Sequence, residues 1–176
     1  MNEQLPTRDQ AIELLRKSGC ASNVVRHCEA VAELAVEMAE CVNKKGLSVD
    51  ANLVEIGALL HDIGRSKTHG VSHGMVGSGI AASFGLSKSV QNVLKRHVGG
   101  GISTREAERL GWPKDVYVPQ TLEEKIVSYA DKLVDNHNMK QVSIDVEIER
   151  LQAAGHKNGA ERVRRLHEEI TALLSN

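Results

Sequence analysis

The chain has 176 residues and a formal net charge of −1 at pH 7; 41% of its residues are hydrophobic and 2% are aromatic. This length favours one domain with a core of aliphatic side chains. The balanced charge argues against nucleic acid or a membrane surface as a stable partner, since both normally need excess lysine and arginine. No apolar run approaches the roughly 20 residues of a membrane span, and neither a signal-peptide pattern nor a C-x-x-C motif occurs. We therefore expect a cytoplasmic protein with free thiols.

Helix start and stop signals recur in chain order and predict an all-α bundle. Thr7 and Gln10 form a capping box for a first helix that ends at Gly19, and a long helix is expected over residues 23–45. Asp50 caps a third helix that ends near residue 64. Further helices are expected over residues 73–84, 88–97, 103–110, 121–136, 142–154 and 160–174. Strand-type alternation is limited to residues 116–118.

Polar residues occur where helical periodicity predicts a buried face. His27 projects between Leu34 and Met38, and His97 completes an i, i+3, i+4, i+7 series of apolar residues. The other polar residues on or beside such faces are His61 with Asp62, His73, and Asp131. Burying so many polar groups costs several kcal/mol unless something satisfies them together. A divalent metal ion does so, because it binds neutral imidazoles and carboxylates at once.

Each of these residues also has a simpler interpretation. A single inward histidine is more often hydrogen-bonded to a backbone carbonyl, and an aspartate within a helix is usually solvated or paired with lysine. His69, in a loop, is an alternative ligand to His73. Because neighbouring helical residues diverge by about 100°, the His61-Asp62 pair either grips one metal near a helix end or is flanked by two metals.

The order His27, His61-Asp62, Asp131 resembles the HD-domain superfamily of metal-dependent phosphohydrolases over roughly residues 22–137. The pattern includes Leu-Leu-His-Asp-Ile-Gly (59–64) and Tyr-Ala-Asp-Lys-Leu (129–133). His73 and His97 fit the six-ligand binuclear subgroup, which includes diadenosine-tetraphosphate hydrolases, HD-GYP phosphodiesterases and a few di-iron oxygenases. The chain lacks the Gly-Tyr-Pro element of HD-GYP proteins. The resemblance implies one all-α HD domain over residues 1–176, with a core at about 22–137 and C-terminal helices at 138–176.

The resemblance also implies a ligand set. The first metal would be held by His27, His61, Asp62 and Asp131, and the second by His73 and His97, with Asp62 bridging. Two divalent transition-metal ions are expected, chosen from Mn, Fe, Co, Ni and Zn, with Mg as an alternative.

The implied reaction is attack by metal-bound hydroxide on a phosphate ester or anhydride of a small phosphorylated molecule such as a nucleotide. Two other functions remain open: a di-iron oxygenase built on the same ligands, and a nucleotide-sensing module without turnover.

Several residues near these motifs are candidates for substrate contact. We expect Arg65 and Lys132 to act with Asp62 in catalysis, and Arg65 and Lys67 to bind substrate phosphate. Arg65 and Lys67 can instead be solvent-exposed cations beyond the C-terminal end of a helix, where such residues are common. Lys132 can be an ordinary surface lysine. Backbone N–H groups of Gly99 and Gly100 could bind an anion, although these glycines could instead serve only as a flexible helix stop.

The C-terminal region offers fewer signals. The Arg162-Val163-Arg164-Arg165 cluster is expected to form a solvated helix face. His137, His156 and His167 are expected to lie on the surface. The C-terminal helices could form the contact of a homodimer.

Overall fold

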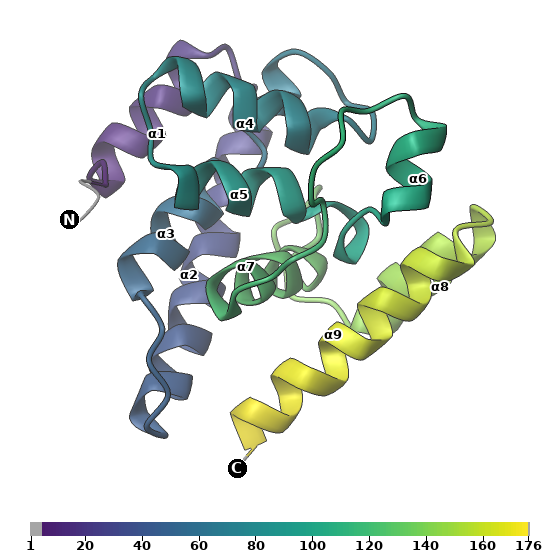
Figure 1. Ribbon diagram of the computed structural model, residues 1–176. Coiled ribbons are helices and arrows are strands. Elements are labelled where there is room, and N and C mark those ends of the chain that lie inside the picture. The colour runs from purple at the N-terminus through teal and green to yellow at the C-terminus, as the bar shows by residue number, and fades with distance from the viewer. Residues whose placement is uncertain (1–4, 176) are drawn as a thin grey trace.

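The computed structural model describes residues 5–175, and within that range the chain folds into α-helices and short 3-10 helices (Figure 1). The N-terminal half contains α1 (Arg8–Lys17), α2 (Ser22–Lys44), α3 (Ala51–Leu60), η1 (Ile63–Ser66), α4 (His73–Ser83) and α5 (Lys88–Arg96). The C-terminal half contains η2 (Val98–Gly100), α6 (Thr104–Arg109), α7 (Leu122–Lys132), α8 (Ile144–Ala153) and α9 (Lys157–Ser175). The all-α prediction is confirmed. Residues 1–4 and 176 of the predicted domain lie outside the described residues.

Local capping signals explain most of the helix starts. The capping boxes expected at Thr7, Ser103 and Thr121 all form. The Asp50 side chain accepts from the backbone N–H groups of the second and third residues of α3, both at 3.0 Å. In place of a strand at residues 116–118, Tyr117 makes one isolated bridge with Ile102.

Two helices end earlier than the sequence predicts. The third helix was expected to continue to about Gly64, but α3 ends at Leu60 and the chain turns through His61 and Asp62 into η1. The helix from residue 121 was expected to reach residue 136, but α7 ends at Lys132. Val134 instead forms an isolated bridge with Gln141, so a backbone pairing takes the place of the last helical turn.

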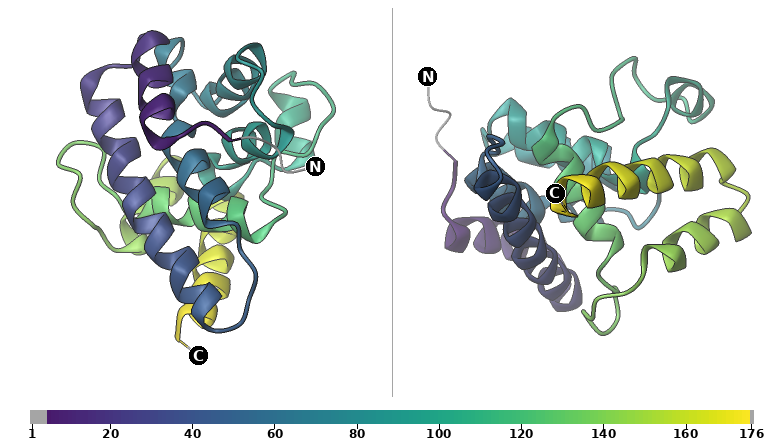
Figure 2. Two further views of the ribbon diagram at one scale, coloured as in Figure 1. Left: turned by 90° about the vertical axis from the view of Figure 1, so that its left-hand side faces the viewer. Right: turned by 90° about the horizontal axis from the view of Figure 1, so that it is seen from below.

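The core is aliphatic, and α2 packs against α3 and α7 within it, while α4 pairs with α5. Cys28 on α2 is fully buried in this core. Helices α8 and α9 form a hairpin that packs against α7 and η2 (Figure 2). In the described part of the chain, none of the helices is both long and apolar enough for a membrane span.

Two glycines allow close approaches between the elements that carry the polar residues. A Cβ atom on Gly64 would lie 1.9 Å from the carbonyl oxygen of His73, so η1 packs directly on the first turn of α4. A Cβ atom on Gly74 would lie 2.8 Å from the carbonyl oxygen of Leu94, so α4 also lies against α5 at a distance that only glycine permits. These contacts bring the His61-Asp62 turn, the start of α4 and the end of α5 together.

Candidate metal centre

The six residues expected to bind metal come together from five parts of the fold. They are His27 from α2, His61 and Asp62 from the turn after α3, His73 at the start of α4, His97 just after α5, and Asp131 from α7. The four histidines and Asp62 are each at most 5% exposed. The ligand atoms of His27, His61 and Asp131 lie within 4.8 Å of one another, as do those of His61, Asp62 and His97.

Asp62 lies between two groups of imidazoles. Its Oδ1 is 3.1 Å from His73 Nε2 and 3.6 Å from His97 Nε2, and its Oδ2 is 3.7 Å from His61 Nε2. Asp131 Oδ1 closes the other side, at 3.0 Å from His27 Nε2 and 3.3 Å from His61 Nε2. The two oxygens of Asp62 therefore face different histidines.

Three of the four histidines are anchored in the same way. The Nδ1 atoms of His61, His73 and His97 each bond to the carbonyl oxygen three residues earlier, at 2.6, 2.8 and 2.7 Å respectively. A carbonyl only accepts, so each Nδ1 carries the proton. In the neutral ring this leaves the lone pair on Nε2, the atom that points toward the carboxylates. A metal-binding histidine is commonly oriented by such a bond from its other nitrogen.

The same anchoring creates a conflict that a cation would resolve. His73 Nε2 and His97 Nε2 lie 3.0 Å apart, and with both protons on Nδ1 their lone pairs face each other. Asp62 Oδ1 and His61 Nε2 are buried without a hydrogen-bond partner among the described residues. Two nitrogens bound at right angles to one ion at about 2.1 Å would be about 3 Å apart. The donor set therefore fits a divalent metal ion.

The electrostatics of the site also favour positive charge at its centre. Burial alone would raise the pKa of Asp62, but the imidazoles of His61, His73 and His97 around it hold it well below its usual value. Burial likewise opposes ionisation of Asp131, yet the Lys132 ammonium and His61 keep its pKa well below normal. Both carboxylates are consequently ionised at neutral pH.

Two histidines respond differently to this environment. Burial lowers the pKa of His97 to about 4, so its ring is neutral at pH 7. Burial would lower the pKa of His61 too, but the Asp62 and Asp131 carboxylates raise it well above its usual value. The position in front of His61 Nε2 thus favours a positive charge, which either a proton or a metal ion can provide.

Lys132 is part of the support for this site. Its ammonium pairs with the second oxygen of Asp131 and donates to the carbonyl of His97 at 3.1 Å. Ser128 donates to the same carbonyl at 3.0 Å. Lys132 is 9% exposed, so its interpretation as an ordinary surface lysine is wrong. In this arrangement it neutralises a carboxylate and ties α7 to the end of α5.

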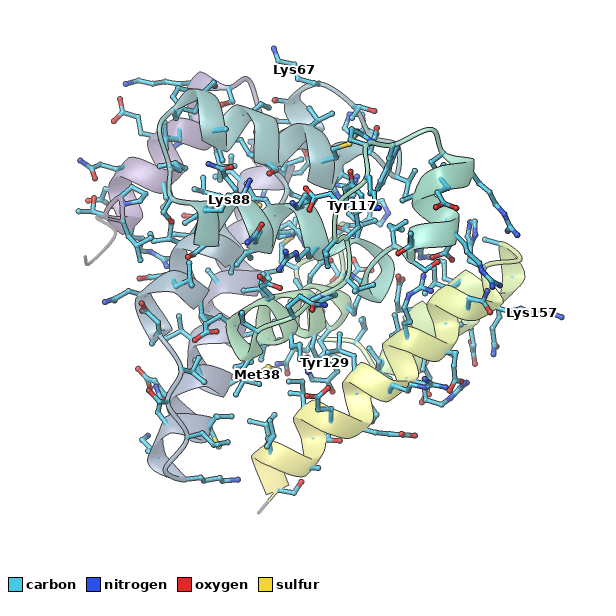
Figure 3. The ribbon with its side chains drawn as sticks, in the orientation of Figure 1. Met38, Lys67, Lys88, Tyr117, Tyr129 and Lys157 are labelled. Atoms are coloured by element: carbon cyan, nitrogen blue, oxygen red, sulfur yellow. The ribbon has the colours of Figure 1, made fainter. Side chains whose placement is uncertain are left out.

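The residues expected to bind substrate do not all lie at one place: Arg65 and Gly99 line a common pocket, whereas Gly100 and Lys67 do not. Arg65 donates through Nε to Asp62 Oδ2 at 2.6 Å and lines a pocket of about 480 Å³ that also reaches His73. Gly99 lines this pocket too, whereas Gly100 is buried beneath α9, with its Cβ direction blocked by Val163. Lys67 is exposed, and Figure 3 shows it at the upper edge of the molecule with its side chain extending outward. The structure does not bring Lys67 to the pocket.

Three arginines and one histidine that line this pocket were not predicted from the sequence to lie there. Arg109, Arg150, His156 and Arg162 all line it. The prediction that Arg162 lies on a solvated face is wrong, because its guanidinium donates to the carbonyl of Gly101 at 3.0 Å and pairs with a glutamate of α6 at 2.8 Å. Each of these residues has the local appearance of a surface position, so no short-range signal distinguishes them.

Comparison with known proteins identifies the family. The HD domain profile matches residues 24–135, which include all six residues of the cluster. The chain belongs to the HD domain family, and proteins of this family bind divalent metals.

The relatives differ in length and in name. An uncharacterized protein of Methanocaldococcus jannaschii is 44% identical over 168 residues, covering 94% of this chain and 98% of that protein. A tRNA (cytidine(56)-2'-O)-methyltransferase of Picrophilus torridus is 37% identical over 172 residues, covering 96% of this chain. The match spans only 48% of the methyltransferase, so about half of that enzyme lies outside it.

A solved structure has the same fold. The HD domain of the Listeria monocytogenes phosphodiesterase PgpH, in complex with cyclic-di-AMP, superposes with a TM-score of 0.56 at 16% identity, covering 95% of this chain and 98% of that chain.

Proposed function

We propose that this protein is a metal-dependent phosphohydrolase that cleaves a phosphate ester or anhydride of a small phosphorylated molecule, namely a nucleotide. The observation that carries the proposal is the set of three histidines whose Nδ1 atoms are anchored to backbone carbonyls while their Nε2 atoms converge on ionised carboxylates. Membership of a family of phosphohydrolases supports it, as does the cyclic dinucleotide bound by the PgpH domain.

The residues would divide their roles as follows. His27, His61 and Asp131 would hold one metal ion, and His73 and His97 a second, with Asp62 between them. Bound divalent metals would supply Lewis acidity, lowering the pKa of a coordinated water and neutralising phosphate charge. Lys132 would keep Asp131 ionised and oriented.

Arg65 would link the metal centre to the substrate. Its Nε is held by Asp62, and its side chain is 26% exposed and lines the pocket. The remaining guanidinium N–H groups can therefore reach a phosphate oxygen, for which the planar fork of arginine is well suited.

The test combines metal analysis with turnover. Protein purified without chelator is assayed for metal per chain and for phosphate release from a panel of nucleotides with added Mn²⁺. We expect two metals per chain and phosphate release, and we expect Asp62→Ala to lose both while its circular dichroism keeps the helical signal. His137→Ala removes an exposed histidine outside the cluster and should change neither.

Three results would contradict the proposal. Absence of bound metal in the purified protein and after added Mn²⁺ would overturn it, as would full phosphate release by Asp62→Ala. Two irons per chain with oxygen consumption and no phosphate release would replace it with oxygenase chemistry.

A further inference from the structure

The pocket beside the metal centre is unusually cationic for this chain. Its lining includes four arginines, 65, 109, 150 and 162, and we call it the arginine pocket. Among the described residues that line it, Glu106 is the single carboxylate. The chain as a whole has a formal net charge of −1, so this positive charge is a local concentration.

The four guanidinium groups are not equally available. Arg65 is held by Asp62 at the metal end, and Arg162 is held by Glu106 and a backbone carbonyl. Arg109 is exposed at the end of α6, and its side chain makes no hydrogen bond or ion pair within residues 5–175. Arg150 donates from Nε and Nη2 to the two carboxylate oxygens of Glu147, at 2.7 and 2.8 Å, and its side chain is 64% exposed with Nη1 left over. Arg109 can therefore turn to an incoming anion at low cost, and Arg150 can offer its Nη1 N–H groups while it stays paired with Glu147.

The helices that carry Arg109, Arg150 and Arg162, namely α6, α8 and α9, are held to each other and to the rest of the fold. Glu106 joins α6 to α9 through Arg162, and the same glutamate caps α6 by accepting from the Ser103 N–H at 2.7 Å. Val163 of α9 packs against Gly100, so the α8–α9 hairpin lies directly on η2 next to His97. Arg150 and Arg162 also lie beyond residue 135, where the HD domain match ends. Arg150 and Arg162 therefore lie outside the matched residues, whereas Arg109 lies within them.

The interior between the charged groups is apolar. Val98, Ile102, Leu110 and Leu151 line the pocket, and its volume of about 480 Å³ is within the usual range for sites that hold small molecules. Aliphatic side chains flanked by arginines suit a ligand with an apolar body and an anionic group at each end.

We propose that Arg109 and Arg150 form a second anion subsite, which binds a phosphate of the substrate other than the one that reaches the metal centre. This inference rests on the proposed function and deepens it. The substrate class is a nucleotide with two separate phosphate groups, one directed to the metals beside Arg65 and the other to α6 and α8. The apolar side chains between them contact the nucleoside.

Binding without turnover tests the subsite separately from catalysis. The full chain is treated with chelator, and its affinities for adenosine 3′,5′-bisphosphate and for adenosine 5′-monophosphate are measured by calorimetry at fixed ionic strength. We expect the bisphosphate to bind at least tenfold more tightly. The double variant Arg109→Gln, Arg150→Gln should abolish this difference while the affinity for the monophosphate stays within about twofold. Arg105→Gln, also on α6 but outside the pocket lining, should leave the difference unchanged.

Equal affinities in the unmodified chain would overturn the subsite, as would a preserved difference in the double variant or an equal loss in Arg105→Gln. The kinetic arm uses the metal-loaded protein and compares kcat/KM for the two nucleotides. If the chain releases phosphate but the double variant has unchanged kcat/KM for the bisphosphate, the subsite fails and the hydrolase stands. If the bisphosphate preference depends on both arginines but no nucleotide is hydrolysed, the subsite stands and the hydrolase fails.

Discussion

Replacing Gly74 with alanine tests whether the close contact between α4 and α5 holds the second half of the metal centre together. The new Cβ would lie 2.8 Å from the carbonyl oxygen of Leu94 and 2.9 Å from Val98 Cγ2, whereas ordinary contacts begin at 3.4 Å. The two helices must therefore separate by about 0.6 Å. The crowded carbonyl is the one that anchors His97 Nδ1, and His73 is the residue next to the substitution.

The expected magnitudes follow from these contacts. Overpacking a well-packed contact costs about 1–3 kcal/mol, and misorienting a metal-binding histidine weakens metal affinity by about 10- to 100-fold. Gly79→Ala is the matched control, because it lies on the same helix and its Cβ meets nothing within 4 Å. That variant should gain up to about 1 kcal/mol from helix propensity alone.

The assay measures two quantities for each variant. Urea unfolding of the metal-free chain should show Gly74→Ala destabilised and Gly79→Ala unchanged or stabilised. Metal titration should show that Gly74→Ala loses affinity for one ion while the half built from His27, His61 and Asp131 keeps the other. If Gly74→Ala keeps the stability of the unmodified chain and both metal affinities, the contact between α4 and α5 does not position His73 and His97.

Three further outcomes follow from the structure. Glu124→Ala should lower the free energy of unfolding by about 3–5 kcal/mol, since its ion pair with an arginine of α5 is buried; Glu169→Ala, which breaks a more exposed pair, should cost at most about 1 kcal/mol in the same denaturant titration. Mass spectrometry after brief alkylation at pH 7.5 should find Cys41 modified first, because Cys28 is buried and burial raises the pKa of Cys20 to about 11; modification of Cys28 in the folded chain would contradict this. Chelation should lower the midpoint temperature of thermal unfolding, because removing a metal that was present at 100 times its Kd removes about 2.7 kcal/mol of folding free energy.

The helices could be predicted because their signals are local. Capping residues such as Thr7 and Thr121 act on backbone groups within one turn, and apolar periodicity marks the buried face of each helix. The two misplaced helix ends depend on distant partners. Gly64 must fit against the first turn of α4, and Val134 pairs with Gln141, so neither boundary could be read from neighbouring residues.

The polar cluster could be predicted in outline for the same reason. A histidine at an apolar position of a helix points inward, and the family motif places Asp62 and Asp131 with it. The arginine pocket could not be predicted, because Arg109, Arg150 and Arg162 come from three helices that meet only in the folded chain. Each of them, taken alone, is an ordinary charged residue on a helix.

The structure also bears on a question that the sequence left open, namely whether the His61-Asp62 pair grips one metal near a helix end or is flanked by two. The pair does lie at a helix end, since α3 stops at Leu60. The two oxygens of Asp62 lie nearest different histidines: Oδ1 is near His73 and His97, and Oδ2 is near His61. The ligand atoms of His61, Asp62 and His97 lie within 4.8 Å of one another, and the group of His27, His61 and Asp131 shares His61 with them. Two ions with Asp62 between them therefore stay a prediction, and the number of metal ions bound per chain tests it.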